Sequence, residues 1–179
     1  MTSAEFAILS LIVELPRHGY EIEQIIEERG MREWTEVGFS SIYYLLNKLE
    51  KKKLITSRTE QTAGRGPARK VYCTTSEGKS ACHEATLEAL KTPHRCYTPI
   101  QLGLANLPGV HATVAIDALK QHLNGLIERL AHIRTRRKEQ QPLPYFVEAM
   151  FDHSILMIEA EKRWIKKFIQ QMEVQDVEN

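Results

Sequence analysis

Apolar and polar residues recur with helical spacing between residues 39 and 52. Ile42, Leu45, Leu46 and Leu49 fall at i, i+3, i+4 and i+7, and because a helix turns by about 100° per residue they share one face. The opposite face carries hydrogen-bonding and cationic side chains, centred on Ser40, Tyr44, Asn47 and Lys51 and flanked by Ser41 and Lys48. The pattern predicts a helix from Phe39 to Lys52, capped by Gly38 or Ser40, that packs on a core through one face only.

The residues after this helix have the pattern of a β-hairpin. Leu54 to Glu60 and Arg69 to Thr74 are predicted strands, and residues 61–68 between them hold two glycines and a proline, which mark a turn. A polar-faced helix followed by a hairpin with a basic tip is the arrangement of a winged helix-turn-helix, with a helix for the major groove of DNA and a wing beside it. The pattern therefore favours this fold for the first half of the chain.

Charge is segregated along the chain in a way that the net charge of +1 hides. Residues 40–70 hold eight Lys or Arg and two acids, a net charge of +6, whereas residues 1–39 hold three basic residues and eight acids, a net charge of −5. A local basic patch is the electrostatic footprint of phosphate-backbone binding. The alternative is a solvated charged face on an ordinary helix. The hairpin favours DNA binding, because Arg65, Arg69 and Lys70 recur where the chain turns back.

Two further helices are predicted before the polar-faced helix. Thr2 or Ser3 can cap the first, which carries Glu5 in its first turn and is apolar on most sides, as expected of a helix buried under several neighbours. Pro16 ends this helix, because proline cannot continue the backbone hydrogen-bond ladder. The second helix is predicted from Tyr20 to about Arg29.

The second half of the chain is predicted to be helical. A helix runs from Ser76 to about Lys91, and a short one starts at Thr98-Pro99. Two long helices follow, from about His111 to Glu139 and from about Tyr145 to Met172. The first of them repeats apolar residues at alternating spacings of three and four, which is the heptad pattern of a helix that packs along a partner helix.

The last helix is apolar on more than one stripe. Between Tyr145 and Ile158 a second apolar face is formed by Phe146, Val147, Met150, Leu156 and Met157. Such a helix contacts its own chain and something else, and the simplest partner is the same helix in a second copy. The alternative is a helical hairpin that closes on its own winged domain. The residues expected at a dimer interface are Ile116, Leu119, Leu123, Leu126, Leu130, Ile133, Phe151, Ile155, Ile158, Ile165 and Ile169.

Composition excludes several classes of protein. Apolar residues make up 42% and charged residues 26%, as in soluble globular proteins, and no apolar run is long enough to span a membrane. The acidic residues in the apolar N-terminal stretch argue against a signal peptide, so we expect a cytoplasmic protein with free thiols. The histidines and cysteines lack metal-ligand spacing, and no phosphate-binding loop or nucleophile motif is present. We therefore expect no metal, no cofactor and no enzyme activity.

A site for a small molecule is a further possibility. Aromatic and methionine side chains form adaptable apolar surfaces, although at helical spacing they are more often part of a core. The candidate residues for binding an effector are Trp34, Phe146, Met150, Met157 and Trp164.

Four motifs follow one another along the first half of the chain. Pro-x-His-Gly-Tyr occupies residues 16–20, Tyr-x-x-Leu-x-x-Leu-Glu residues 43–50, Arg-Lys-x-Tyr residues 69–72 and Thr-x-x-Gly residues 75–78. Together they resemble the PadR family of bacterial transcriptional regulators. Lys53 departs from the family, which usually has glycine there, and a left-handed backbone at that point would cost about 1 kcal/mol. Leu15 and Thr74 also depart, from glycine and an aliphatic residue.

The resemblance implies a homodimer formed through the C-terminal helices. Some members of the family also sense aromatic compounds such as phenolic acids, or drugs, between the winged and dimerisation domains. The resemblance therefore implies that a small aromatic or drug-like effector is a candidate ligand of this chain.

We expect a mainly α protein with a small β-hairpin wing. Residues 1–91 would form a winged helix-turn-helix and residues 92–179 a dimerisation domain of antiparallel long helices. The expected function is that of a homodimeric, sequence-specific repressor on a pseudo-palindromic operator in double-stranded DNA, released by an effector. The alternative is a protein-interaction module that ignores DNA and needs no basic face. The residues expected at DNA are Tyr20, Ser40, Ser41, Tyr43, Tyr44, Asn47, Lys48, Lys51, Arg65, Arg69 and Lys70.

Overall fold

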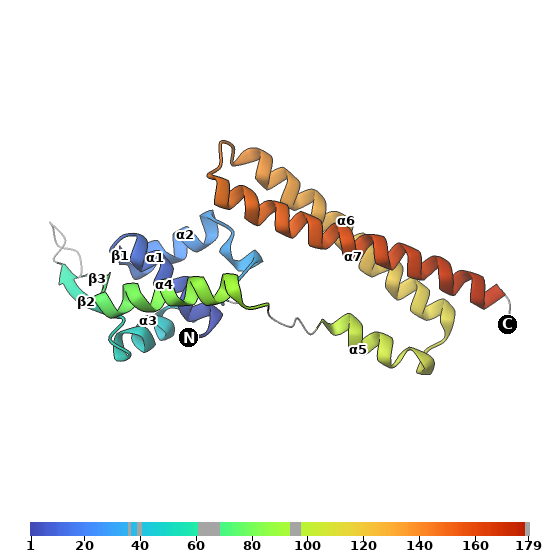
Figure 1. Cartoon of the computed structure of the whole chain (residues 1–179), viewed down its shortest axis with the longest axis horizontal. Helices are drawn as coiled ribbons and strands as arrows, with labels where there is room; N and C mark the ends of the chain where they lie inside the picture. Colours follow the sequence, from blue (N-terminus) through green and yellow to red (C-terminus); the bar gives the residue numbers. More distant parts are fainter. Residues whose placement is uncertain (36, 39–40, 61–68, 94–97, 178–179) are drawn as a thin grey trace. The chain divides into compact units, whose positions relative to one another are not determined.

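A computed structural model of the chain describes residues 1–35, 37–38, 41–60, 69–93 and 98–177. The chain forms two compact units, Met1–Arg95 and Cys96–Asn179, each with its own apolar core. The first holds a small sheet among helices and the second a long helical hairpin (Figure 1). The prediction of a mainly helical protein with a small β wing is confirmed.

Helices and strands of the first unit enclose one apolar core. Its elements are α1 (Ser3–Glu14), β1 (Arg17–His18), α2 (Gly19–Glu28), α3 (Ile42–Lys51), β2 (Ile55–Glu60), β3 (Arg69–Thr74) and α4 (Ser76–Lys91). The largest wholly buried apolar side chains come from α1, α2, α3 and β2: Ile8, Leu9, Ile12, Ile22, Ile26, Ile42, Leu46, Leu49 and Ile55. The four apolar residues that predicted the polar-faced helix are all buried in this core, which leaves its opposite face to solvent.

The sheet has three strands, where the sequence pattern predicted only a hairpin. The strand order is β1-β3-β2 and both pairs are antiparallel, with His18 opposite Val71 and Ile55 opposite Thr74. β1 has only two residues, too few for an alternating pattern to be visible in the sequence. Pro16 favours extended backbone in the residue before it, and Leu15 is extended at φ −155°, so the chain leaves α1 in strand conformation.

The start of α3 differs from the prediction. The helix begins at Ile42 with Ser41 at its N-cap, whereas Gly38 or Ser40 was expected as the cap of a helix from Phe39. The Ser41 hydroxyl donates to the carbonyl oxygen of Gly38 at 2.8 Å, a local bond of the kind by which serine competes with helix formation. Phe39 and Ser40 lie outside the described residues.

At the end of α3 the backbone of Lys53 is left-handed. This residue has φ 58°, in the left-handed region that usually needs glycine. The Leu54 N–H donates to Leu49 O at 3.0 Å and the Lys53 N–H to Glu50 O at 2.9 Å, the two bonds of a Schellman cap. The cap turns the chain directly into β2, at a cost of about 1 kcal/mol for the side chain of Lys53.

The Thr-x-x-Gly motif joins the end of α3 to the start of α4. Thr75 caps α4 by accepting from the Gly78 N–H at 2.9 Å, and its hydroxyl lies 2.8 Å from the Lys53 carbonyl oxygen. Gly78 is packed so closely that a Cβ there would lie 2.0 Å from the carbonyl oxygen of Leu54. Only glycine fits this contact, which holds the base of the wing against α4.

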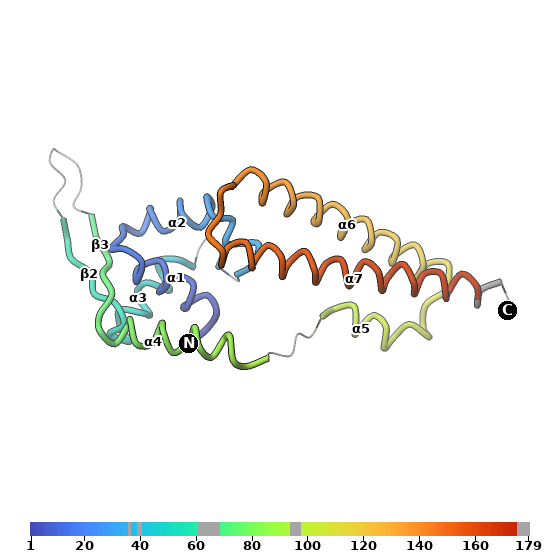
Figure 2. Tube along the Cα trace, turned by 45° about the horizontal axis from the view of Figure 1, so that its top comes forward, coloured from blue at the N-terminus to red at the C-terminus, as the bar shows by residue number. Residues whose placement is uncertain are grey.

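The second unit consists of α5 (Pro99–Ala105), α6 (Ala112–Glu139) and α7 (Tyr145–Val177). Figures 1 and 2 show α6 and α7 side by side as an antiparallel hairpin, and α7 continues five residues beyond the predicted end at Met172. No helix of the described chain combines the length and the apolar character needed to cross a membrane.

The heptad stripe of α6 packs against α7 of the same chain. Seven residues expected at a dimer interface are buried in this intrachain core: Ile116, Leu126, Leu130, Ile133, Ile158, Ile165 and Ile169. The remaining four, Leu119, Leu123, Phe151 and Ile155, are partly buried against it. These side chains hold the hairpin together, and their part in a dimer stays a prediction.

Candidate nucleic-acid interface

The exposed face of α3 carries the side chains that were predicted to read DNA. Tyr44, Asn47 and Lys51 lie opposite the buried stripe, and 64% of Tyr44 is exposed. They combine hydroxyl, amide and ammonium groups, and an asparagine amide can form two hydrogen bonds to the edge of an adenine base. The core therefore presents the polar face of a rigid helix to solvent.

One flank of α3 rests on the start of α2. A Cβ atom at Gly19 would lie 2.7 Å from Cε1 of Tyr43, so only a glycine lets the Tyr43 ring approach the α2 backbone this closely. On the same flank the Ser57 hydroxyl donates to the Glu50 carboxylate at 2.6 Å, which ties β2 to α3. The glycine of the Pro-x-His-Gly-Tyr motif thus positions a tyrosine of the next motif.

The other flank of α3 is held by a buried carboxylate in α1. Only 1% of Glu5 is exposed, and its Oε1 atom lies 3.0 Å from Lys48 Nζ and 2.8 Å from Lys52 Nζ. Burial alone would raise the pKa of Glu5, but the hydrogen bond from Lys52, the backbone N–H of Thr2 and the bond from Lys48 outweigh it and lower the pKa to about 2. Glu5 is therefore ionised at neutral pH.

The base of the wing is tied to α2 by aromatic contacts. The Arg69 guanidinium carbon lies 5.2 Å from the centre of the Tyr20 ring, and Arg69 donates to the Tyr20 hydroxyl at 3.3 Å. On β1 the His18 ring stacks with Tyr20 at 5.5 Å, and His18 Nδ1 lies 3.0 Å from the Lys70 carbonyl oxygen. These contacts place the Arg69 guanidinium beside the N-terminus of α2.

The residues predicted at DNA that the structure describes fall into three groups. Tyr43, Tyr44, Asn47 and Lys51 are exposed on α3. At the base of the wing Arg69 contacts Tyr20, and Lys70 follows Arg69 on β3. Ser41 and Lys48 have partners within the protein, the Gly38 carbonyl and Glu5. Ser40 and Arg65 lie outside the described residues.

The structure also reveals the part of Glu5, which the sequence analysis placed only in the first turn of α1. The only signal in the sequence was an acidic residue in the first turn of a mostly apolar helix.

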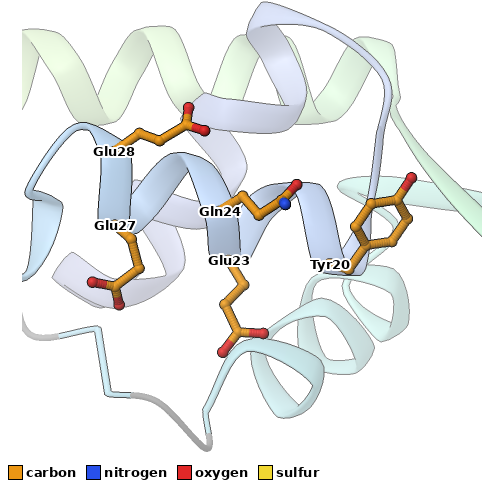
Figure 3. Close-up of a pocket in the computed structure, with 5 residues that line it drawn as sticks. All are labelled: Tyr20, Glu23, Gln24, Glu27 and Glu28. Atoms are coloured by element: carbon orange, nitrogen blue, oxygen red, sulfur yellow. The ribbon is translucent and has the colours of Figure 1, made fainter.

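An acidic surface on α2 borders this interface. An open depression of about 520 Å³ is lined by Tyr20, Glu23, Gln24, Glu27 and Glu28, all from α2 (Figure 3). Carboxylates repel a phosphate backbone, so this surface marks an edge of the basic face rather than an extension of it.

The residues predicted to bind an effector are not gathered in this depression. Trp34 is exposed in the first unit, and Phe146, Met150, Met157 and Trp164 are exposed on α7 in the second. The Trp164 ring stacks on Phe168 with 5.3 Å between centres. Among the described residues no group of three His, Cys, Asp or Glu side chains is placed to hold a metal ion.

Comparisons with known proteins agree with this arrangement. The family model described as the transcriptional regulator PadR-like family matches residues 8–84. An uncharacterized protein X of Lysinibacillus sphaericus is 36% identical over 81 residues, which are 45% of this chain and 72% of that protein.

Two solved structures of Bacillus subtilis PadR share the fold. The structure in complex with operator DNA has a TM-score of 0.76 at 20% identity, over 94% of this chain and 98% of that one. The structure in complex with p-coumaric acid has a TM-score of 0.78 at 19% identity, over 96% and 99%. The winged unit, the helical hairpin, the motifs and the family match lead to one conclusion: this chain belongs to the PadR-like family of transcriptional regulators.

Proposed function

We propose that this protein is a homodimeric repressor that binds a pseudo-palindromic operator through α3 and the wing and is released by a small aromatic effector. Residues 1–91 form the DNA-binding domain in this proposal and residues 92–179 the dimerisation domain. A single observation carries it: α3 presents a polar face to solvent, while its two flanks contact α2 and Glu5 and its opposite face is buried in the apolar core.

The chemistry of that face suits base recognition. Asn47 is exposed at its centre, and the exposed side chains of Tyr43 and Tyr44 precede it by about one helical turn. Hydrogen-bonding side chains of this kind read base edges in the major groove, while cations such as Lys51 hold the phosphates that set the register. Ser41 lies at the N-terminus of α3, where the first residues of a recognition helix meet DNA.

The base of the wing supplies backbone contacts. Arg69 and Lys70 start β3, and Arg69 is oriented by its contact with Tyr20. The wing would hold the phosphates or the minor groove beside the site that α3 reads. Arg65 belongs to this proposal on its sequence position alone.

A second copy would cover the exposed apolar stripe of α7. Phe146, Met150, Met157 and Trp164 follow one another at spacings of four and seven and lie within about 40° of one another around the helix. Met157 is 60% exposed although α7 packs its neighbouring stripe against α6. Apolar side chains in such a row are typical of an interface. Two copies would present two copies of α3 to half-sites about one helical turn apart.

An effector would compete for some of the same side chains. Bacillus subtilis PadR, with which this chain shares its fold, has been solved with p-coumaric acid. The exposed aromatic and methionine side chains of α7 suit a flat aromatic ligand because they adapt to its shape, and Trp34 is a separate candidate in the first unit. Binding of the effector would release the operator if the effector-bound dimer held its two DNA-binding units at a spacing that does not match the half-sites.

The first test is a gel shift on DNA from upstream of the protein's own gene, with excess non-specific competitor and at two salt concentrations. The proposal predicts a shift that resists the competitor and contains two protein chains per duplex. Loss of every shift, followed by failure to recover any duplex from a genome-wide selection of bound fragments, would favour the protein-interaction module instead.

Asn47 provides a sharper test within the operator. Asn47→Ala is expected to relax the preference at one base position by about 1–3 kcal/mol, because one bidentate contact is lost. The measurement is a binding competition among operators varied at each position. Equal weakening on all sequences would show that Asn47 does not read a base.

A further inference from the structure

Glu5 is a buried acid beside a surface that is otherwise built for phosphate. Among the described residues it is the charged side chain with the least exposure, at 1%. It sits in the first turn of α1, while the two lysines that contact it belong to α3 or follow it directly. A buried charge is costly unless it is fully paired, so its partners are strongly constrained.

Both oxygens of the carboxylate are in use. Oε2 accepts from the Thr2 N–H at 2.9 Å, and Oε1 lies within 3.0 Å of the ammonium groups of Lys48 and Lys52. Thr2 in turn accepts from the Glu5 N–H at 3.2 Å, which completes a capping box. The helix cap thus fixes the carboxylate, and the carboxylate fixes the two lysines.

The two lysines lie one helical turn apart on a flank of α3. At about 100° per residue they lie to one side of the exposed face, which is centred on Tyr44, Asn47 and Lys51. Their side chains are 38% and 43% exposed, so they are near enough to solvent to reach a phosphate if nothing held them. If the two lysines moved away from Glu5, its carboxylate would stay buried without a partner. This cost in free energy opposes transfer of the lysines to DNA phosphates.

We propose that Glu5 is a positioning residue that withholds Lys48 and Lys52 from the phosphate backbone, so that a larger share of the binding free energy comes from the base-reading face of α3. This inference rests on the proposed DNA-binding function. Lysine–phosphate contacts strengthen binding to every sequence by about the same factor, so withholding them lowers the affinity for all DNA and leaves the specificity ratio unchanged. The proposal removes Lys48 from the set of direct contacts and keeps Lys51 in it.

The first experiment compares the wild type with Glu5→Gln, which keeps the size of the side chain and removes its charge. Binding is measured at several salt concentrations on two probes: a duplex that the wild type selects from a random-sequence library, and a scrambled duplex of the same composition. Each lysine freed to contact a phosphate is expected to steepen the log–log salt dependence by about 0.9, and to tighten binding to the scrambled duplex about eightfold at 0.1 M salt. Binding to the selected duplex should tighten by a similar factor, because the added contacts are to phosphates and not to bases.

A second experiment leaves Glu5 intact, so it does not depend on the folding of Glu5→Gln. Lys48→Gln is compared with Lys51→Gln, a matched variant from the exposed face of the same helix. The proposal predicts that Lys51→Gln lowers the salt slope by about 0.9 and that Lys48→Gln leaves it unchanged. Equal losses of slope for the two variants would place Lys48 on a phosphate and overturn the proposal.

The outcomes separate this inference from the proposed function. A purely structural role of Glu5 would weaken binding of Glu5→Gln to both probes with an unchanged slope, and that result would overturn the inference alone. Absence of wild-type binding to every duplex would overturn the proposed function and the inference with it. A steeper slope for Glu5→Gln together with an unchanged slope for Lys48→Gln would support both.

Discussion

The two units of this chain bury their apolar residues to different degrees. In the winged unit nine large apolar side chains from three helices and a strand are less than 2% exposed. Among the described residues of the α6–α7 hairpin, Ile165 alone reaches this level, and its neighbours Ile116, Ile158 and Ile169 are each 6% exposed. Two helices share a single seam and enclose few side chains completely, whereas three helices and a sheet enclose many. The winged unit thus encloses its core, whereas the hairpin leaves large apolar side chains such as Met157 exposed.

The same substitution should have opposite effects in the two units, and this is the largest difference we expect. Gly78→Ala would place a methyl group 2.0 Å from the Leu54 carbonyl oxygen, so it should destabilise the winged unit by about 3 kcal/mol. Gly125→Ala, in the middle of α6 with nothing within 4 Å, should stabilise its helix by about 1 kcal/mol. Urea denaturation measures both, and equal effects would contradict the comparison.

Acid should loosen the winged unit through Glu5. The pKa of Glu5 is about 2 in the folded chain against 4.5 ordinarily, so its contribution is fully present above pH 4.5 and is lost as the pH falls toward 2. The shift corresponds to about 3 kcal/mol, and the exposure of the two lysines reduces this to about 2 kcal/mol. The difference in unfolding free energy between wild type and Glu5→Gln should therefore shrink as the pH falls from about 5 to about 2. A constant difference over this range would rule out the ion pairs as its source.

A charge introduced into the apolar stripe of α7 should weaken association of the proposed dimer. Met157→Glu puts a carboxylate on a residue that is 60% exposed in the single chain, so the fold of one chain should change little. Burial of that charge in a dimer should weaken association by about 2 kcal/mol, or about 30-fold in Kd. Sedimentation over a range of concentrations measures this change.

A matched control for this variant comes from the same helix. Gln170 is exposed on α7 and lies about 140° around the helix from the apolar stripe, so Gln170→Glu adds the same charge away from the proposed interface. It should leave the Kd of the dimer near the wild-type value. An unchanged Kd for Met157→Glu, or equal weakening by both variants, would place the dimer interface elsewhere.

The smallest effect is expected at the end of α3. Lys53→Gly should stabilise the winged unit by about 1 kcal/mol, because glycine adopts φ 58° without strain. The effect is measured as a rise in Tm. A lower Tm would mean that the Lys53 side chain makes a compensating contact.

Much of the winged unit could be predicted from the sequence because its signals are local. The spacing of Ile42, Leu45, Leu46 and Leu49 determined the buried face of α3, and the residues of β3 matched the predicted strand. In each case the information lies within a few residues of the feature.

The rest depended on contacts between distant residues. β1 exists because Arg17 and His18 pair with Tyr72 and Val71, and nothing in the two residues themselves indicates a strand. The ion pair of Glu5 with Lys48 and Lys52 joins residues more than 40 positions apart, and a sequence pattern cannot show which lysine it reaches. The assignment of individual side chains to DNA, dimer or effector stays a prediction for the same reason, since it concerns contacts with other molecules.

The contact between Gly78 and Leu54 has a mechanical consequence. α4 is the last element of the winged unit, so any force that arrives along the chain from the second unit enters through it. At its first turn there is no slack, because the backbone of Gly78 already touches the carbonyl that follows the end of α3. A tilt of α4 would therefore displace the Leu54 carbonyl and, with it, the end of α3. Gly78 is the residue through which this displacement would pass.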